Sequence, residues 1–236
     1  MKLLYVFAFF AVLVGLASSK QGSTKPGTTK QESSKSATIE TKLVCEIGDA
    51  VIKTKWVDMM PTCTGLLEKQ IKLEMTAALT YLAMGAHFAR DTVSRPGFSK
   101  FFFEAANEER EHAIKVIEYL LMRGGLTGST SSILNFAAIR GSVTRKHWNG
   151  LDALEDALKL ETDVTKSIRN ITSFCETADD FNDYHAVDYF TEDFLDEQYK
   201  GQRDLAGKLT TLSKMKQAQG ELGEFLFDKK LLYGEI

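Results

Sequence analysis

The stretch ANEEREHA, residues 106–113, holds three glutamates and one histidine and begins three residues after the end of the apolar triplet Phe101–Phe103. Most charged residues in such a run lie on the solvated face of a helix. Glu109 and His112 differ, because they are three residues apart and in line with apolar neighbours such as Val116, which places both on a buried helix face. A buried carboxylate beside an imidazole is a suitable ligand pair for iron or a similar divalent ion.

The other long helical patterns each place polar side chains of the same kind within their apolar stripes. Glu74 and Tyr81 lie two turns apart in the first, Glu161 lies in the third and Gln198 in the fourth. Counted from one end of a bundle at about 1.5 Å per residue, Glu109 and its counterparts on the other helices lie within roughly 5 Å of one level. Buried carboxylates at one level repel each other unless a cation lies between them. The predicted metal ligands are Glu74, Glu109, His112, Glu161 and Gln198.

A simpler interpretation is that each polar side chain is satisfied separately, Glu109 by Arg110 and His112 by a backbone carbonyl. For a single residue, separate satisfaction is the better interpretation. On four helices, however, it would have to occur independently each time and at the same height. A shared metal ion explains the common height better. The second metal position is expected to be weak, because Gln198 and Gly201 stand where a second Glu-x-x-His pair would have Glu and His. Such a site suits iron that passes through better than a permanent di-iron cofactor.

Long helices are needed to bring these side chains together, and the apolar period of the chain predicts four of them. Only three prolines occur, and no segment alternates regularly as a strand does. A long connection over 126–148 separates the second helix from the third, which is typical of a bundle with one crossover. The predicted fold is therefore all-α, a four-helix bundle with one long crossover connection and a short C-terminal fifth helix. The predicted helices are Thr64–Ala89, Ser99–Met122, Leu151–Cys175, Tyr184–Met215 and 221–232.

The N-terminal part of the chain is expected to lie outside this fold. Lys2 precedes an apolar run that ends in two serines, which predicts a signal peptide over 1–19. A membrane anchor is the alternative, but the run is short for a bilayer and no other stretch could span one. Residues 20–44 repeat lysine at five-residue spacing among Ser and Thr, so we expect a disordered arm, which acts as a solvated spacer more readily than as a polycation or O-glycosylated tail.

The remaining residues, 45–236, are expected to form one domain, in a chain that is secreted or lies in the lumen of the secretory pathway. The formal net charge of −3 gives no electrostatic reason to expect nucleic acid as a partner. No membrane is expected as a partner either, once the signal peptide is removed.

The three cysteines take their meaning from this compartment, because an oxidising environment favours disulfides. No CxxC pair is present, which disfavours a thiolate metal site. Cys63 opens the first predicted helix and Cys175 closes the third, and the crossover topology puts these two ends at the same end of the bundle. We therefore predict an intrachain Cys63–Cys175 disulfide, with Cys45 left for a bond to another chain.

Around these residues the sequence resembles the ferritins, and specifically the secreted heavy-type chains of insects, over about 45–232. The segments that carry the resemblance are IKLEMTAALTYLAM, NEEREHAIKVIEYLLMRGG, LKLETDVTKSI, FLDEQYKGQRDLAGKLTTL and GELGEFLFDK. The resemblance implies a shell of 24 subunits, in which copies of this chain mix with light-type chains. It also implies that the shell oxidises Fe(II) with oxygen or peroxide and stores ferric mineral inside.

Carried over by motif, the resemblance divides the predicted ligands between two iron sites per subunit. Glu74, Glu109 and His112 resemble the ligands of the first. Glu109 would bridge to a second iron, held by Glu161 and Gln198. Tyr81 resembles the tyrosine beside that centre, so Tyr81 and Glu109 are the implied catalytic residues.

Two features depart from the family pattern or add to it. Where cytosolic chains have two acidic residues in the threefold channel, this chain has Asp188 and Thr191, with Glu192 next to Thr191. The sequence therefore does not identify the route by which iron enters the shell. Asn170 begins a glycosylation sequon, but on a predicted helix, where such acceptors are less common.

Two other functions remain alternatives. One is a structural or storage subunit with little catalysis that depends on a partner chain, and the other is a di-iron oxidase or peroxidase on the same bundle. The short terminal helix favours the shell, because it is expected to pack only against neighbouring subunits. The weak second metal position argues against the oxidase.

Overall fold

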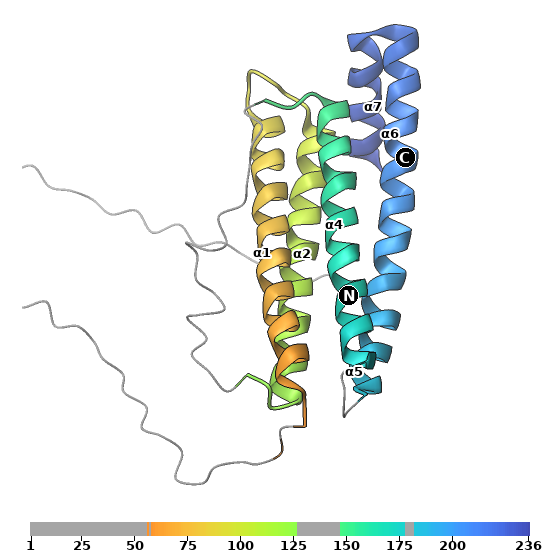
Figure 1. Ribbon diagram of the computed structural model, residues 1–236. Helices are drawn as coiled ribbons and strands as arrows, with labels where there is room; N and C mark the ends of the chain where they lie inside the picture. Colours follow the sequence, from red (N-terminus) through yellow and green to blue (C-terminus); the bar gives the residue numbers. More distant parts are fainter. Residues whose placement is uncertain (1–55, 57, 127–146, 178–181) are drawn as a thin grey trace, which may run out of the picture. The chain divides into compact units, whose positions relative to one another are not determined.

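The computed structural model describes residues 56, 58–126, 147–177 and 182–236 (Figure 1). The predicted signal peptide, the lysine-rich arm, Cys45 and most of the long connection lie outside the described residues. Within the described part the chain is helical and contains no strand, which confirms the all-α prediction. None of the helices described is both long enough and apolar enough to cross a membrane.

The helices are α1 (Pro61–Ala89), α2 (Pro96–Met122), α4 (Gly150–Thr177), α5 (Tyr184–Tyr189), η1 (Phe190–Leu195), α6 (Asp196–Gln219) and α7 (Glu221–Tyr233). In Figure 1, α1 lies beside α2 and α4 beside α6, while α7 lies along one end of α6. The first two helices begin three residues earlier than predicted, at Pro61 and Pro96. Proline suits the first helical position, because its fixed backbone angle is helical and the N–H that it lacks would be unbonded there.

The fourth helix is interrupted, in contrast to the single helix predicted over Tyr184–Met215. Its middle section, η1, is a π-helical turn, whose hydrogen bonds close a larger ring than those of an α-helix. Phe190, Phe194 and Leu195 are all buried there. The predicted metal ligand Gln198 follows directly, and π-helical turns often lie next to functional residues.

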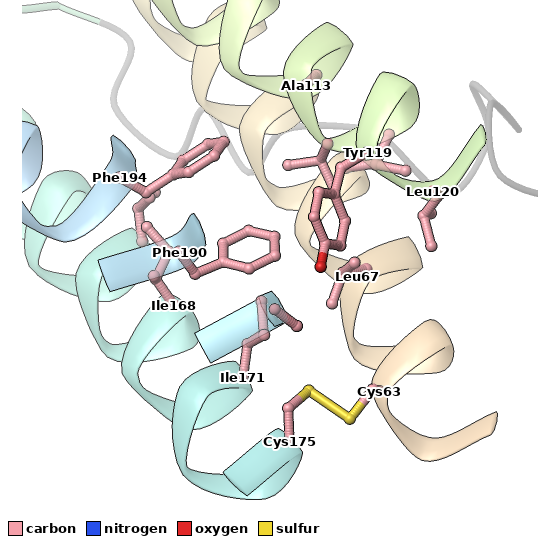
Figure 2. Close-up of a cluster of buried hydrophobic side chains, with 14 of the residues drawn as sticks. Cys63, Leu67, Ala113, Tyr119, Leu120, Ile168, Ile171, Cys175, Phe190 and Phe194 are labelled. Carbon is pink, nitrogen blue, oxygen red and sulfur yellow. A yellow bond between two sulfur atoms is a disulfide. The ribbon is translucent and has the colours of Figure 1, made fainter. Parts of the chain in front are cut away.

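Two hydrophobic clusters fill the bundle and leave a polar layer between them. One lies around Tyr119, Phe190 and Phe194 at the end of the bundle that carries the disulfide (Figure 2), and the other lies around Phe98 and Phe102. On α2, α4 and α6 the predicted metal ligands fall between residues of the two clusters. These ligands are Glu109, Glu161 and Gln198.

A disulfide joins Cys63 at the start of α1 to Cys175 near the end of α4, as predicted. The two Cα atoms are 5.5 Å apart although 112 residues separate them in the sequence. In the chain-entropy view, closing so long a loop stabilises the folded state by about 4–5 kcal/mol. The bond therefore ties the two halves of the bundle together at one end.

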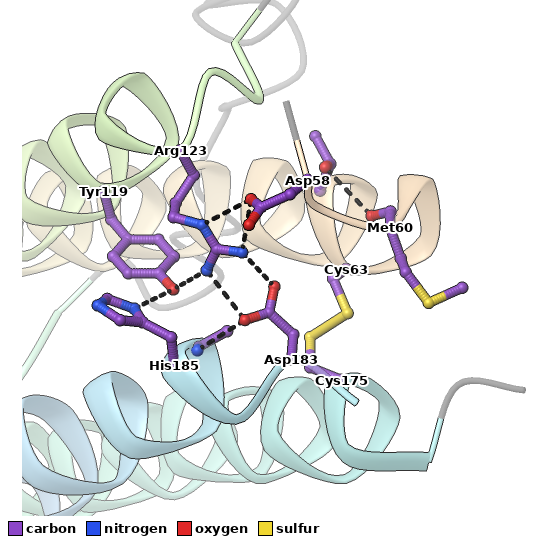
Figure 3. Close-up of polar contacts among 10 residues, drawn as sticks. Asp58, Met60, Cys63, Tyr119, Arg123, Cys175, Asp183 and His185 are labelled. Carbon is purple, nitrogen blue, oxygen red and sulfur yellow. Dashed lines mark hydrogen bonds and ion pairs between the residues drawn. A yellow bond between two sulfur atoms is a disulfide. The ribbon is translucent and has the colours of Figure 1, made fainter. Parts of the chain in front are cut away.

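Arg123, at the end of α2, organises the polar contacts at this same end (Figure 3). It donates hydrogen bonds to both carboxylate oxygens of Asp183, each at 2.9 Å, and to Asp58 Oδ1 at 2.9 Å. Asp183 also accepts from the backbone N–H of Ala186 and so caps α5. One guanidinium therefore connects the segment before α1, the end of α2 and the start of α5.

The terminal helix α7 packs on its own chain, against α2 and α6, so the expectation that it packs only against neighbouring subunits was wrong. Asp228 Oδ1 accepts from the backbone N–H of Phe98 at 3.0 Å, and Glu224 Oε2 accepts from that of Gly150 at 3.2 Å. These carboxylates thus satisfy N–H groups at the starts of α2 and α4, where the helix dipoles favour negative charge. A Cβ at Gly97 would lie 1.9 Å from the backbone oxygen of Asp228, so only glycine permits this approach.

Candidate metal centre

Three of the predicted ligands come together in the interior of the bundle. Glu74 on α1, and Glu109 and His112 one turn apart on α2, each offer one ligand atom, and these atoms lie within 4.8 Å of one another. The three residues are 0%, 4% and 6% exposed. Two carboxylates and one imidazole, buried at this spacing, are a ligand set that suits iron or a similar divalent ion.

Part of this cluster is left without protein partners. Gln70 Nε2 donates to Glu74 Oε1 at 2.6 Å. In contrast, Glu74 Oε2, Glu109 Oε2 and His112 Nδ1 are buried without a hydrogen-bond partner in the described part of the chain. Because buried polar atoms are nearly always bonded, three unbonded ligand atoms in one cluster fit a site that binds a cation.

The simpler interpretation, in which each residue is satisfied separately, was wrong for this pair of residues. Arg110 contacts Glu111 at 3.4 Å, and not Glu109. The polar neighbours of His112 are carboxylates, with Glu109 Oε1 at 3.6 Å from Nδ1 and Glu197 Oε2 at 3.4 Å from Nε2. The imidazole therefore lies between acidic groups, where a metal ion would also be attracted.

The other predicted residues, Glu161, Gln198 and Tyr81, line a cavity of about 220 Å³ that Glu109 and His112 also line. The Tyr81 hydroxyl donates a hydrogen bond to Glu161 Oε1. Glu161 does not belong to the cluster of ligand atoms within 4.8 Å of one another. The predicted ligands of the first metal position are therefore close together, whereas Glu161 and Gln198, predicted for the second, line the cavity beside them.

Burial and mutual repulsion raise the pKa values of these acidic groups. The pKa of Glu109 rises to about 8, through its burial and then the charge of Glu161. Burial, followed by the charge of Glu109, raises the pKa of Glu74 well above its ordinary value. Burial also raises the pKa of Tyr81, with Glu161 as the next cause. Without a metal the site therefore retains protons near neutral pH, and a divalent cation would displace them.

Two residues of the site were not predicted from the sequence. Gln70 is fully buried and lies one turn before Glu74 on the same stripe, a spacing that could have identified it. Glu197 gives no such signal, because the residue next to Gln198 should point away from the core. Its side chain is in fact 53% exposed, yet its carboxylate reaches the imidazole of His112.

The sequence positions that depart from the family pattern lie on the surface. Asp188, Thr191 and Glu192 are exposed on α5 and η1, and Asn170 is exposed on α4. The route by which iron enters and the use of the Asn170 sequon are not tested by these positions.

Comparison with known proteins gives consistent matches. Residues 64–215 match the family model described as Ferritin-like domain. The Ferritin heavy chain of Papilio xuthus is 56% identical over 193 residues, which cover 81% of this chain and 90% of the relative. The Ferritin heavy chain of Trichoplusia ni is 56% identical over 189 residues, or 80% and 88% of the two chains. The crystal structure of Trichoplusia ni secreted ferritin aligns with a TM-score of 0.72 and 54% identity, over 80% of this chain and 97% of that chain.

Proposed function

The chain belongs to the ferritin family, and from this premise we propose that Glu74, Glu109 and His112 bind the iron that it oxidises. Like the heavy chains it resembles, it is an iron-storage subunit with ferroxidase activity. The observation that carries the assignment of residues is the compact buried cluster, in which Glu74 Oε2, Glu109 Oε2 and His112 Nδ1 have no hydrogen-bond partner in the described part of the chain.

Iron is the substrate of this site, and the ligand types favour its oxidation. Carboxylates are hard ligands that stabilise Fe(III) more than Fe(II), so they favour the oxidised product. Glu109 both belongs to the compact cluster and lines the cavity with Glu161, so we propose that it bridges two irons. Two irons held together can deliver two electrons to oxygen or peroxide in one event.

We propose that the second iron binds weakly, between Glu109, Glu161 and Gln198. The amide of Gln198 carries no charge, and its oxygen already accepts a hydrogen bond from Thr165 at 2.9 Å. Gly201, on the rim of the same cavity, provides no ligand. Weak binding lets ferric product leave toward the store. Tyr81 is proposed to lie beside the centre and to hold Glu161 in position through its hydroxyl.

Ferritins form multimeric shells, and we propose a shell of 24 subunits for this chain, shared with light-type chains. We also propose that the chain is secreted, after loss of residues 1–19, because its sequence is 54% identical to that of a secreted ferritin. Residues 20–44 would then form an arm on the domain over 45–236.

His112→Ala tests the assignment. The variant should lose fast Fe(II) oxidation by about 100-fold or more, because loss of even an outer-shell partner of a metal ligand typically costs 10–100-fold. The folded assembly should remain, since the cavity left by one imidazole costs at most a few kcal/mol. The assay is oxygen consumption on addition of Fe(II) to an assembly that contains no other heavy-type chain.

The matched control is His147→Ala, because His147 is exposed and lies outside the cluster. This control should oxidise Fe(II) at the parent rate. Normal oxidation in His112→Ala would end the assignment, and absence of oxidation in the parent assembly would favour the catalytically weak subunit that depends on a partner chain.

A further inference from the structure

A row of aromatic rings leads away from the proposed iron site toward the end of the bundle that carries the disulfide. The ring of Phe194 lies 5.8 Å from that of His112, centroid to centroid. Tyr189 lies 5.7 Å from Phe194. Tyr119 stacks on Tyr189 at 4.5 Å, with the ring planes 14° apart. Figure 2 shows Tyr119 facing Phe190 and Phe194 across the core.

The row ends at a phenol that has a base beside it. Tyr119 is 2% exposed, and its hydroxyl oxygen lies 3.0 Å from Nδ1 of His185 (Figure 3). His185 itself is exposed. With its own proton on Nε2, this imidazole accepts a hydrogen bond from the phenol at one nitrogen and releases a proton to solvent from the other.

The remaining contacts of Tyr119 hold this geometry. Arg123 Nη1 donates to the Tyr119 hydroxyl at 2.7 Å, and the guanidinium is in turn held by Asp183 and Asp58. Burial raises the pKa of Tyr119 to about 12, so the phenol keeps its proton at neutral pH unless the ring is oxidised. Loss of an electron from this ring must therefore be coupled to transfer of the proton to His185.

The oxidation chemistry of the iron site creates a use for such a residue. Oxygen needs four electrons to become water, and a pair of Fe(II) ions supplies two. One pair of irons therefore reduces oxygen only to peroxide, which accepts two more electrons before it becomes water.

We propose that Tyr119 is a redox-active residue that supplies one electron to the iron centre along this row of rings and passes its phenolic proton to His185. The inference rests on the proposed ferroxidase function of the site. Phe194 only bridges His112 to Tyr189, because a phenylalanine ring is too hard to oxidise to hold the charge itself.

The step is balanced. The oxidant is the peroxide left when two Fe(II) ions reduce oxygen by two electrons. It takes one electron from the Tyr119 ring and one from a further Fe(II) ion, and with two protons from solvent it becomes two waters. The O–H bond of Tyr119 breaks in the same step, and its proton moves to Nδ1 of His185. The products are a neutral phenoxyl radical and an imidazolium, which returns a proton to solvent. A later Fe(II) ion, the substrate of the site, supplies the electron that restores the phenol, and solvent supplies the proton.

Tyr81 lies at the site and Tyr189 lies within the row, and each would give a radical of its own. The test therefore uses a background in which both are replaced by phenylalanine, which keeps the rings in place. Iron-free assemblies of this background are loaded with Fe(II) without oxygen, mixed with oxygenated buffer and frozen within the first turnovers. Electron paramagnetic resonance then detects a tyrosyl radical, which ring-deuterated tyrosine identifies through its narrowed splitting. Adding Tyr119→Phe should abolish this signal, because phenylalanine keeps the stacked ring but has no phenolic proton to release.

Tyr184→Phe is the matched control, since Tyr184 begins α5 beside His185 but is 61% exposed and makes no ring contact in the row. It should keep the parent signal. His185→Gln, which retains a hydrogen-bonding side chain but not a base, should lower the signal without preventing Fe(II) oxidation. A signal unchanged by both Tyr119→Phe and His185→Gln would overturn the proposal. An assembly of the unmodified chain, with Tyr81 in place, that does not oxidise Fe(II) would refute the ferroxidase assignment instead, so the two failures are distinguishable.

Discussion

Replacing Glu109 by glutamine should have opposite effects on iron oxidation and on the stability of the iron-free protein. The amide keeps the shape of the side chain and removes its ionisable carboxyl. As the proposed bridging ligand, Glu109 contacts both irons, so Glu109→Gln should slow Fe(II) oxidation by at least about 100-fold. Without iron, however, the parent protein must bury a carboxyl group that burial and Glu161 disfavour in its charged form.

The pH dependence of this stability effect has a defined sign. The pKa of Glu109 is about 8 in the folded protein, against an ordinary value of 4.5. Between these two values the folded state binds more protons than the unfolded chain, so the free energy of unfolding falls as pH rises. Burial of the Glu109 carboxyl does not lower the free energy of unfolding below about pH 4.5, and it lowers this free energy by the full amount above about pH 8. At about 1.4 kcal/mol per pH unit, the penalty at pH 7 is on the order of 3 kcal/mol.

Iron-free Glu109→Gln should therefore melt close to the parent near pH 4.5 and roughly 6–12 °C above it at pH 7, from the usual relation between stability and Tm for a chain of this size. Calorimetry across this pH range, together with oxygen consumption at pH 7, measures both effects. Glu111→Gln is the control, because it makes the same change of side chain at an exposed position on α2. A Glu109→Gln protein that oxidises Fe(II) normally, or that melts below the parent at every pH, would refute the reasoning.

Three further predictions concern the rest of the chain. Arg123→Met should lower the free energy of unfolding by about 3–5 kcal/mol in chemical denaturation, because it removes the charged partner of the buried Asp183 carboxylate. Replacing Cys63 and Cys175 by serine should cost about 4–5 kcal/mol in the same assay, through the lost loop closure. Residues 1–19 should be absent from secreted material by N-terminal sequencing, and trypsin should cut the arm that follows in the assembled particle.

Control variants and contradicting outcomes can be stated for each of these three predictions. Arg110→Met removes an exposed ion pair and should change stability by less than about 1 kcal/mol. Cys45→Ser should abolish any disulfide between chains without weakening the bundle. A Cys45–Cys63 linked peptide in unreduced digests would contradict the pairing, and an intact N-terminus would contradict the signal peptide. Protection of the arm from trypsin would show that it is ordered in the shell.

Much of this fold and site was predictable because its signals are local. An amphipathic helix repeats every 3.6 residues, so a polar residue such as Glu109 within the apolar stripe must point inward wherever the helix packs. A common level on four helices then follows from the rise per residue. The Cys63–Cys175 pairing followed in the same way, since the order of helices determines which ends meet.

Other features depend on how the helices pack, which local patterns do not encode. The spacing of apolar residues does not predict the π-helical turn before Gln198. One additional residue in a turn changes this spacing too little to be recognised. Glu197 reaches His112 only because its helix lies close enough for a flexible exposed side chain to bend back. The terminal helix packs on its own chain through Asp228 and Glu224, whose partners are backbone N–H groups that carry no sequence signal. The sequence by itself thus determined which side chains face inward and at what height. Only the tertiary structure decided which of them meet, because contact distances depend on the packing of helices far apart in the chain.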